Sequence, residues 1–270
     1  MKQPLKIVVL AKQVPDTRNV GKDAMTPEGT VNRAALPAIF NPEDLNALEL
    51  ALSLKDRVEG ATVHVLTMGP QRAADIIRDA MFRGADGGYL LSGREFAGSD
   101  TLATSYALSC ALKKIAPDVI VAGRQAIDGD TAQVGPQMAE KLHLPQITYA
   151  ADITKEGDTV TVKRMLEDGY MTIKTKTPCL ITCIKELNEP RYMSVGSVFE
   201  AYSKPLTTFG YEDLKDDPLI DATTIGLKGS PTNIFKSFTP PQKGAGMMLE
   251  GSDKATCEKL AGMLAAKHII

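Results

Sequence analysis

A segment rich in glycine and hydrogen-bond donors, residues 123–136, has the residue types that bind a phosphate. It follows an apolar run and reads Gly-Arg-Gln-Ala-Ile-Asp-Gly-Asp-Thr-Ala-Gln-Val-Gly-Pro. Gly123 lets a ligand approach the backbone, and Arg124 can pair with a phosphate through two donors. Asp130 or Thr131 can cap the next helix, whose N-terminus then faces the anion. Because the segment matches neither GxGxxG nor a Walker loop, an ordinary strand-to-helix turn with a surface arginine is the alternative.

Further polar side chains bear on ligand binding. Asp128 and Asp130 would repel a diphosphate, so we expect them to cap, to bind a ribose hydroxyl or to turn outward. Thr101 and Thr104 lie one turn apart on a predicted helix, so their hydroxyls share a face and can donate to a ligand. The alternative is a plain helix start that is capped by Asp100.

Composition excludes several classes of protein. The 270 residues are 43% hydrophobic, so we expect a hydrophobic core. The formal charge is only -2, so we expect no binding to nucleic acid. We expect no membrane insertion, because no apolar run reaches the length of a spanning helix. The four cysteines form no CxxC pair and histidines are few, so we expect no metal site. Free thiols fit a reducing cytoplasm, where we expect the protein to reside.

The first half of the chain alternates apolar runs with helical periodicity, which predicts an α/β fold with a mostly parallel sheet. We expect a three-layer α/β/α, Rossmann-like nucleotide-binding domain over residues 1–190. The strands predicted for this half are Leu5–Ala11, Thr62–Thr67, Gly88–Leu91 and Val119–Ala122. Helices are expected to begin after Asn41-Pro42, after Gly69-Pro70, near Asp100 and just before Val134.

The pattern changes in the second half. We expect flanking antiparallel strands at Ile147–Ile153, Thr159–Met165, Tyr170–Lys176 and Leu180–Ile184. From about Arg191 the prolines, among them Pro240 and Pro241, argue against regular helix or a central strand. Residues 191–270 therefore read as a recognition loop and an extended C-terminal arm on a partner, closed by a helix that Ser252 caps.

Seven sequence blocks, in order, resemble the β (small) subunit of electron transfer flavoproteins. The resemblance spans nearly the whole chain. It rests on Lys12–Thr17, Asn41-Pro42, Met68-Gly69-Pro70, Asp100–Thr104, Gly123–Pro136, Leu187–Tyr192 and Gly229–Thr232.

The resemblance implies a heterodimer with a large (α) subunit, and it points to one branch of the family. In one branch the small subunit holds AMP, and in the other it holds a second FAD and the heterodimer bifurcates electrons from NADH. Arg124, Gly129 and the Asp100–Thr104 block resemble the FAD branch. The family then implies electron transfer to the FAD of the large subunit, to a flavin dehydrogenase such as an acyl-CoA dehydrogenase, and to ferredoxin or flavodoxin.

The same resemblance implies the site residues. It makes the chain an electron-transfer component of an NADH-dependent complex, not a stand-alone enzyme, with no catalytic side chain. Tyr192 and Val195 fall in the family's recognition loop, for which a solvated loop is the alternative. For Met68 and Asn41, core packing and helix capping are the alternatives. The cofactor-binding residues implied are Leu10, Ala11, Asn41, Asp44, Met68, Thr101, Thr104, Gly123, Arg124, Gln125, Ala126, Ile127, Asp128, Gly129, Asp130, Thr131, Ala132, Gln133 and Val134.

Two other functions are open to this sequence. The chain could be a non-bifurcating flavoprotein subunit that holds AMP as a structural nucleotide, because a phosphate-binding turn does not separate AMP from FAD. It could also be an adenylating enzyme that consumes ATP on a similar sheet. Such enzymes have a glycine-rich loop after the first strand, whereas residues 11–17 here contain no glycine.

Overall fold

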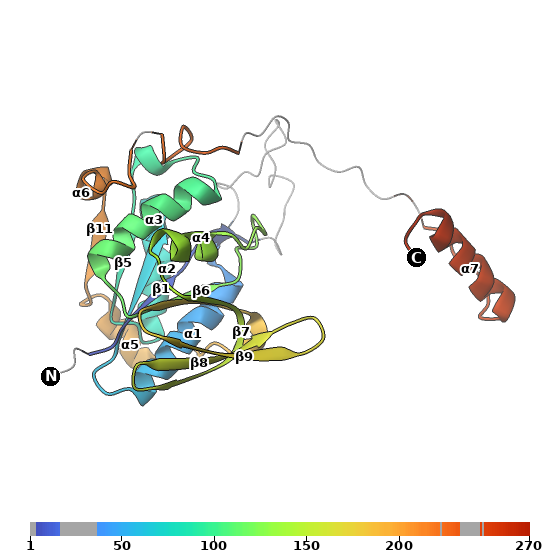
Figure 1. Ribbon diagram of the computed structural model, residues 1–270, viewed down its shortest axis with the longest axis horizontal. Helices are drawn as coiled ribbons and strands as arrows, with labels where there is room; N and C mark the ends of the chain where they lie inside the picture. Colours follow the sequence, from blue (N-terminus) through green and yellow to red (C-terminus); the bar gives the residue numbers. More distant parts are fainter. Residues whose placement is uncertain (1–3, 17–36, 222, 233–243, 245) are drawn as a thin grey trace.

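A computed structural model describes residues 4–16, 37–221, 223–232, 244 and 246–270; Thr17, Pro240 and Pro241 lie outside these ranges. Its centre is a nine-stranded sheet (Figure 1). In spatial order the strands are β11 (Leu206–Phe209), β5 (Gly87–Leu91), β4 (Thr62–Met68), β1 (Lys6–Leu10), β6 (Val119–Gly123), β10 (Cys179–Cys183), β7 (Gln146–Glu156), β8 (Thr159–Met165) and β9 (Tyr170–Lys176).

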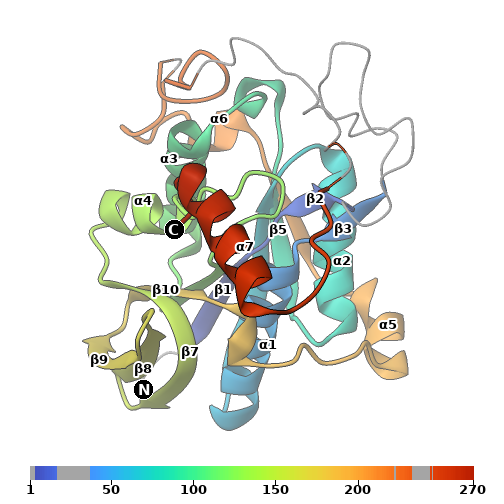
Figure 2. The ribbon, with the colours of Figure 1, turned by 90° about the vertical axis from the view of Figure 1, so that its right-hand side faces the viewer.

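Helices cover both faces of this sheet, which makes the fold a three-layer α/β/α sandwich, as predicted. Figure 2 shows α1 and α2 on one side of the sheet and α3 and α4 on the other. Alternate residues of β1 divide between the two layers, with Ile7 and Val9 in one buried cluster and Val8 and Leu10 in the other. The helices are α1 (Pro42–Arg57), α2 (Ala74–Phe82), α3 (Thr101–Ile115), α4 (Val134–Lys141), α5 (Val195–Ala201), α6 (Tyr211–Leu214) and α7 (Lys254–Ala266).

The prediction of flanking antiparallel strands is correct for one part of the second half and wrong for the other. Strands β7, β8 and β9 pair antiparallel in sequence order. Strand β10, however, lies inside the sheet and runs parallel to both β6 and β7. Every residue of β10 is buried, as expected of a central parallel strand that is covered on both faces.

Regular structure also continues past Arg191, so the prediction that it ends there is wrong. Helix α5 begins at Val195 after Ser194, whose side chain accepts a hydrogen bond from the N–H of Ser197 at 3.1 Å. Strand β11 adds a parallel edge strand beside β5. The sheet therefore extends beyond residue 190, the expected end of the α/β domain.

One smaller feature was not predicted, and another was predicted at a different residue. Strands β2 (Gln13–Pro15) and β3 (Ala38–Phe40) form a separate antiparallel pair. Helix α7 is capped by Asp253 and not by Ser252, because the Asp253 carboxylate accepts the Thr256 N–H at 2.8 Å.

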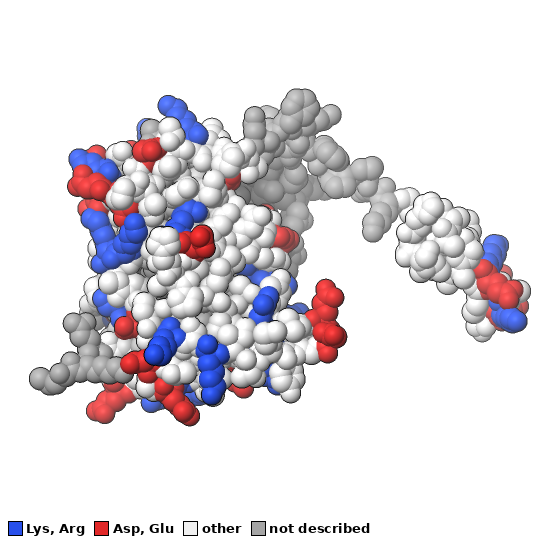
Figure 3. Space-filling view, in the orientation of Figure 1, with Lys and Arg blue, Asp and Glu red and all other residues white. Residues whose placement is uncertain are grey.

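Helix α7 stands apart from the sheet and its covering helices (Figure 1). It has no buried residue, and Leu260 is about half exposed. Residues 260–266 carry no charge, and this part of the helix is white in Figure 3, whereas acidic and basic side chains mix on the adjoining body. An uncharged helix surface of this kind is suited to pack against another protein.

Candidate functional site

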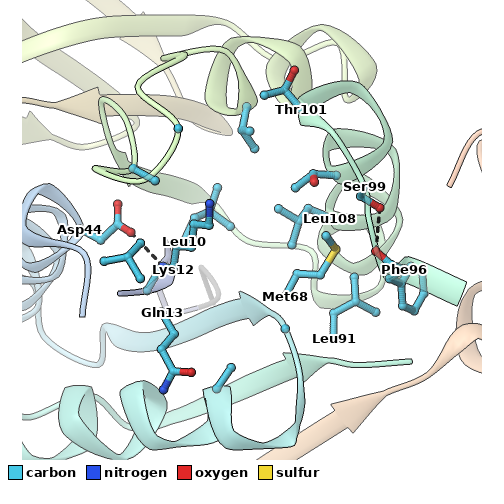
Figure 4. A pocket seen from close by; sticks show the side chains of 18 of the residues that line it. Leu10, Lys12, Gln13, Asp44, Met68, Leu91, Phe96, Ser99, Thr101 and Leu108 are labelled. Carbon is cyan, nitrogen blue, oxygen red and sulfur yellow. Dashed lines mark hydrogen bonds between the residues drawn. The ribbon is translucent and has the colours of Figure 1, made fainter. Parts of the chain in front are cut away.

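A cavity of about 840 Å³ opens where β1, β4, β5 and β6 end. This is the edge at which parallel α/β sheets bind ligands, because the segments after neighbouring strands diverge there. Figure 4 shows the side chains of Leu10, Met68, Leu91 and Leu108 together in the cavity, with Thr101 at the start of α3, the helix that also carries Leu108. Strand β1 ends at Leu10, one residue before the expected end at Ala11, and four of its five residues are buried.

The structure brings most of the predicted site residues around this one cavity. Three do not line it: Asn41, which bonds to the loop, and Ile127 and Asp128, which belong to the loop. Those that line it are Leu10, Ala11, Asp44, Met68, Thr101, Thr104, Gly123, Arg124, Gln125, Ala126, Gly129, Asp130, Thr131, Ala132, Gln133 and Val134.

Asn41 holds the loop after β6 and does not cap α1. Its Nδ2 donates to the carbonyl of Gln125 at 2.9 Å, and its Oδ1 accepts the N–H of Ile127 at 3.1 Å. The α1 N-terminus has no side-chain cap, so the predicted capping role is wrong. The expected proline at the first turn, Pro42, is present. Asn41 is fully buried, and both polar atoms of its amide bond to the loop.

Glu43 and Asp44, in the first turn of α1, also hold this loop. Asp44 Oδ1 accepts the N–H of Gly123 at 3.1 Å, and Glu43 Oε2 accepts that of Gln125 at 3.0 Å. The other Asp44 oxygen accepts the N–H of Lys12 at 2.9 Å, which ties the end of β1 to the end of β6. Burial raises the pKa of Asp44 to about 7, although these donors act in the opposite direction.

Gly123 is needed for a different reason from the one predicted. A Cβ at this position would lie 2.5 Å from Oδ1 of Asp44 and 2.8 Å from the carbonyl carbon of Glu43. The absent side chain therefore lets α1 approach β6. Gly129 is the position that leaves room for a ligand, because a Cβ there would meet nothing within 4 Å.

The acidic side chains of the loop bond to neighbouring protein groups, and Asp130 lines the cavity whereas Asp128 does not. Asp128 forms an ion pair with Lys12 at 2.7 Å, and its side chain is only 6% exposed. Asp130 accepts a hydrogen bond from the side-chain amide of Gln125 at 2.9 Å. Neither Asp130 nor Thr131 caps α4: the N-cap is Gln133, which makes no side-chain cap.

The uncapped approach to α4 leaves backbone donors free. Asp130 and Ala132 have positive φ angles of 48° and 52°, which curl the backbone ahead of the helix. Among the described residues, the N–H groups of Thr131, Ala132 and Gln133 meet no protein acceptor. Such a concave run of N–H groups at a helix N-terminus attracts an anion.

Arg124 supplies positive charge beside these donors. One of its terminal nitrogens lies 3.0 Å from Oε1 of Glu43, and its guanidinium lies 5.8 Å from the centre of the Tyr149 ring. Its Nε is buried and has no hydrogen-bond partner in the part of the chain that the structure describes. An orphan donor next to unpaired N–H groups fits a phosphate ligand.

The structure confirms the capping interpretation of the start of α3. Asp100 caps the helix by accepting the N–H of Ala103 at 3.0 Å, as predicted. Thr101 and Thr104 nevertheless line the cavity. The Thr101 hydroxyl donates to the side-chain oxygen of Gln133 at 2.9 Å, so α3 and the loop before α4 are joined across the cavity wall.

One wall of the cavity was missed by sequence analysis. The segment after β5 contributes seven lining residues without a recognisable motif. They are Ser92, Gly93, Arg94, Phe96, Ala97, Gly98 and Ser99. Its position at the carboxyl end of a parallel strand was the available signal, since neighbouring strands end at the same crevice.

Tyr192 and Val195 lie on the surface, on the segment that leads into α5. They are 93% and 78% exposed, and Phe199 and Tyr202 beside them are also largely exposed. Aromatic side chains at the surface are typical of protein interfaces.

Among the described residues, no helix is long and apolar enough to cross a membrane.

Comparisons with known proteins identify the family to which the chain belongs. The family model of the electron transfer flavoprotein domain matches residues 28–213. The chain is 58% identical to the acryloyl-CoA reductase electron transfer subunit gamma of Anaerotignum propionicum. It is 49% identical to the caffeyl-CoA reductase-Etf complex subunit CarD of Acetobacterium woodii. It is 46% identical to the electron transfer flavoprotein subunit beta of Clostridium acetobutylicum.

Each of these alignments covers 98% of this chain and 100% of the relative. The chain therefore belongs to the electron transfer flavoprotein family, among its β-type subunits.

Proposed function

We propose that the cavity binds FAD and that the chain is the small subunit of a bifurcating electron transfer flavoprotein. In this function it accepts electrons from NADH and passes them to the FAD of a large (α) subunit. From there one route leads to a partner dehydrogenase, such as an acyl-CoA dehydrogenase, and the other to ferredoxin or flavodoxin. The proposed setting is the cytoplasm.

The observation that carries this proposal is the size of the cavity together with the Arg124 guanidinium and the N–H groups of residues 131–133 on its wall. A volume of about 840 Å³ lies in the upper range of small-molecule sites. AMP has fewer than half the non-hydrogen atoms of FAD, so a dinucleotide uses this space better. The relatives' names support the setting, since two of them belong to acryloyl-CoA and caffeyl-CoA reductase systems.

Different residues would hold different parts of the proposed cofactor. Bound FAD would supply hydride and electron chemistry, and the chain would supply binding and orientation. Arg124 and the N–H groups of residues 131–133 would hold the diphosphate. The Thr104 hydroxyl would donate to the edge of the ring, and the Thr101 hydroxyl would do so in place of its bond to Gln133. Gly129 would leave the room that a dinucleotide requires.

The test is to co-purify the chain with its large subunit and to extract the bound nucleotides. Two FAD per heterodimer are expected, with an absorption spectrum that NADH bleaches. One FAD and one AMP would contradict the proposal and would make the chain a structural nucleotide binder. Released pyrophosphate from ATP would instead indicate an adenylating enzyme.

Arg124→Ala separates the two nucleotides further. If the cavity binds FAD, this variant should lose flavin while the flavin of the large subunit stays. If the cavity binds AMP, assembly should weaken and flavin content should not change. Arg57→Ala is the matched control, because Arg57 is exposed in the last turn of α1.

A further inference from the structure

A strap formed by residues 225–232 packs against the segment after β5, outside the lining of the cavity. The N–H of Leu227 donates to the carbonyl of Ala97 at 3.0 Å, and that of Gly226 donates to Oγ of Ser99 at 3.1 Å. Ala97 and Ser99 are lining residues of the cavity. The strap therefore packs on the reverse side of a wall that the proposed cofactor would touch.

Ser230 is the residue through which the strap reaches α3. Its Oγ accepts the backbone N–H of Asp100 at 2.8 Å, and it lies 2.7 Å from the carbonyl of Gly226, to which it donates. The carbonyl of Gly98 is also within 3.2 Å. One hydroxyl thus fixes the residue that caps α3 with respect to the strap.

Asp100 completes the connection in the opposite direction. One carboxylate oxygen accepts the N–H of Ala103 and caps α3, and the other accepts the N–H of Thr232 at 3.1 Å. The residue directly after Asp100 is Thr101, which lines the cavity and donates to Gln133. A shift of the strap would therefore move the start of α3.

The strap has little freedom to pack in another way. Gly226 has a φ of 63°, and a Cβ there would lie 2.2 Å from the carbonyl oxygen of Glu95. Gly98 has a φ of 76°, and a Cβ there would lie 3.1 Å from Cβ of Leu227. Both sides of the contact need glycine, because the two backbones approach closely in a left-handed conformation.

We propose that Ser230 is a positioning residue, which sets the start of α3 and hence the Thr101 and Thr104 hydroxyls relative to the cofactor. This inference rests on the proposed nucleotide-binding function of the cavity. The root of the C-terminal arm then shapes the site, although Ser230 does not itself line it. The Ser230 hydroxyl positions α3 and does not touch the cofactor. Its loss therefore shifts the residues around the cofactor without removing a group that contacts it.

The experiment compares Ser230→Ala, Ser230→Thr and the control Ser203→Ala in the full heterodimer. Ser203 is exposed and its hydroxyl bonds only to the carbonyl of Glu200. Because Ser230→Ala loses one hydrogen bond, we expect the β-subunit flavin to be retained about tenfold more weakly. The absorption band and the midpoint potential of that flavin should also shift. Ser230→Thr should restore all three, and Ser203→Ala should leave them unchanged.

Two results would overturn the positioning role. One is a Ser230→Ala heterodimer with wild-type retention, spectrum and potential. The other is a loss of flavin that accompanies a lower urea midpoint and that Ser230→Thr does not repair. A wild-type heterodimer with one FAD and one AMP contradicts the proposed function but not the positioning role of Ser230. The rate of AMP release from the same three variants then tests that role.

Discussion

The side-chain oxygen of Asn41 accepts a hydrogen bond from the backbone N–H of Ile127 at 3.1 Å, across 86 residues of sequence. Its amide nitrogen donates to the carbonyl of Gln125. Together with Glu43 and Asp44 at the start of α1, this residue fixes the conformation of the loop after β6 by hydrogen bonds. The loop is shaped by protein contacts, so its free N–H groups are already in place for a ligand.

Asn41→Ala should destabilise the protein by about 3 kcal/mol, because it leaves the N–H of Ile127 and the carbonyl of Gln125 without partners. Urea unfolding followed by circular dichroism measures this change. Asn41→Asp keeps the acceptor for Ile127 but offers no donor to Gln125, and it should fall below the wild type as well. A wild-type urea midpoint for Asn41→Ala would contradict this role of Asn41.

Stability should fall as the pH rises from about 4 to 7. The folded pKa of Asp44 is about 7 against an ordinary value of 3.8, because burial disfavours the charged form. Folded protein therefore holds more protons than unfolded protein in this window, and Asp44 lowers stability by at most about 4 kcal/mol as it ionises. The free energy of unfolding of Asp44→Asn, measured at pH 5, 6, 7 and 8, should decline less than that of the wild type. Parallel curves would exclude Asp44 as the cause.

Gly129→Glu should remove the flavin of this subunit and leave the fold intact. A side chain at position 129 points into open space, so its volume and charge enter the cavity beside the proposed diphosphate site. We expect flavin content to fall from two toward one per heterodimer. Gly129→Ala is the control, and it should keep both flavins with a stability change within about 0.5 kcal/mol. Two retained flavins in Gly129→Glu would place the cofactor elsewhere.

Val195→Asp should slow electron transfer to the partner dehydrogenase by tenfold or more, because a charge replaces an apolar contact at an interface. Val195 is 78% exposed, so flavin content and stability should not change. Stopped-flow reduction of the dehydrogenase by the reduced heterodimer gives the rate. Val195→Leu preserves apolar contact and should behave as wild type. An unchanged rate in Val195→Asp would show that the partner docks on another surface.

Local signals in the sequence predicted the elements that position the site. Strand β1 was expected at Leu5–Ala11 and is observed at Lys6–Leu10, and Asp100 caps α3 as expected. Both depend on neighbouring residues: an apolar run in one case and a capping side chain in the other.

Features that depend on distant partners could not be predicted in this way. Asn41 serves a loop more than eighty residues away, and nothing near it in sequence indicates this. The segment after β5 forms a cavity wall through its place in the sheet. Helix α5 is only seven residues long and contains Gly196, so its periodicity is too weak to recognise.

The position of β10 in the sheet has a consequence for synthesis of the chain. Strand β6 pairs with β1 on one side, but its other neighbour, β10, is made about sixty residues later. Until the ribosome has passed Cys183, β6 presents an open apolar edge, and the N–H of Arg124 lacks the Cys183 carbonyl that it bonds at 2.9 Å. Nascent chains that stop short of this strand are therefore prone to self-association, and the completed strand closes that edge.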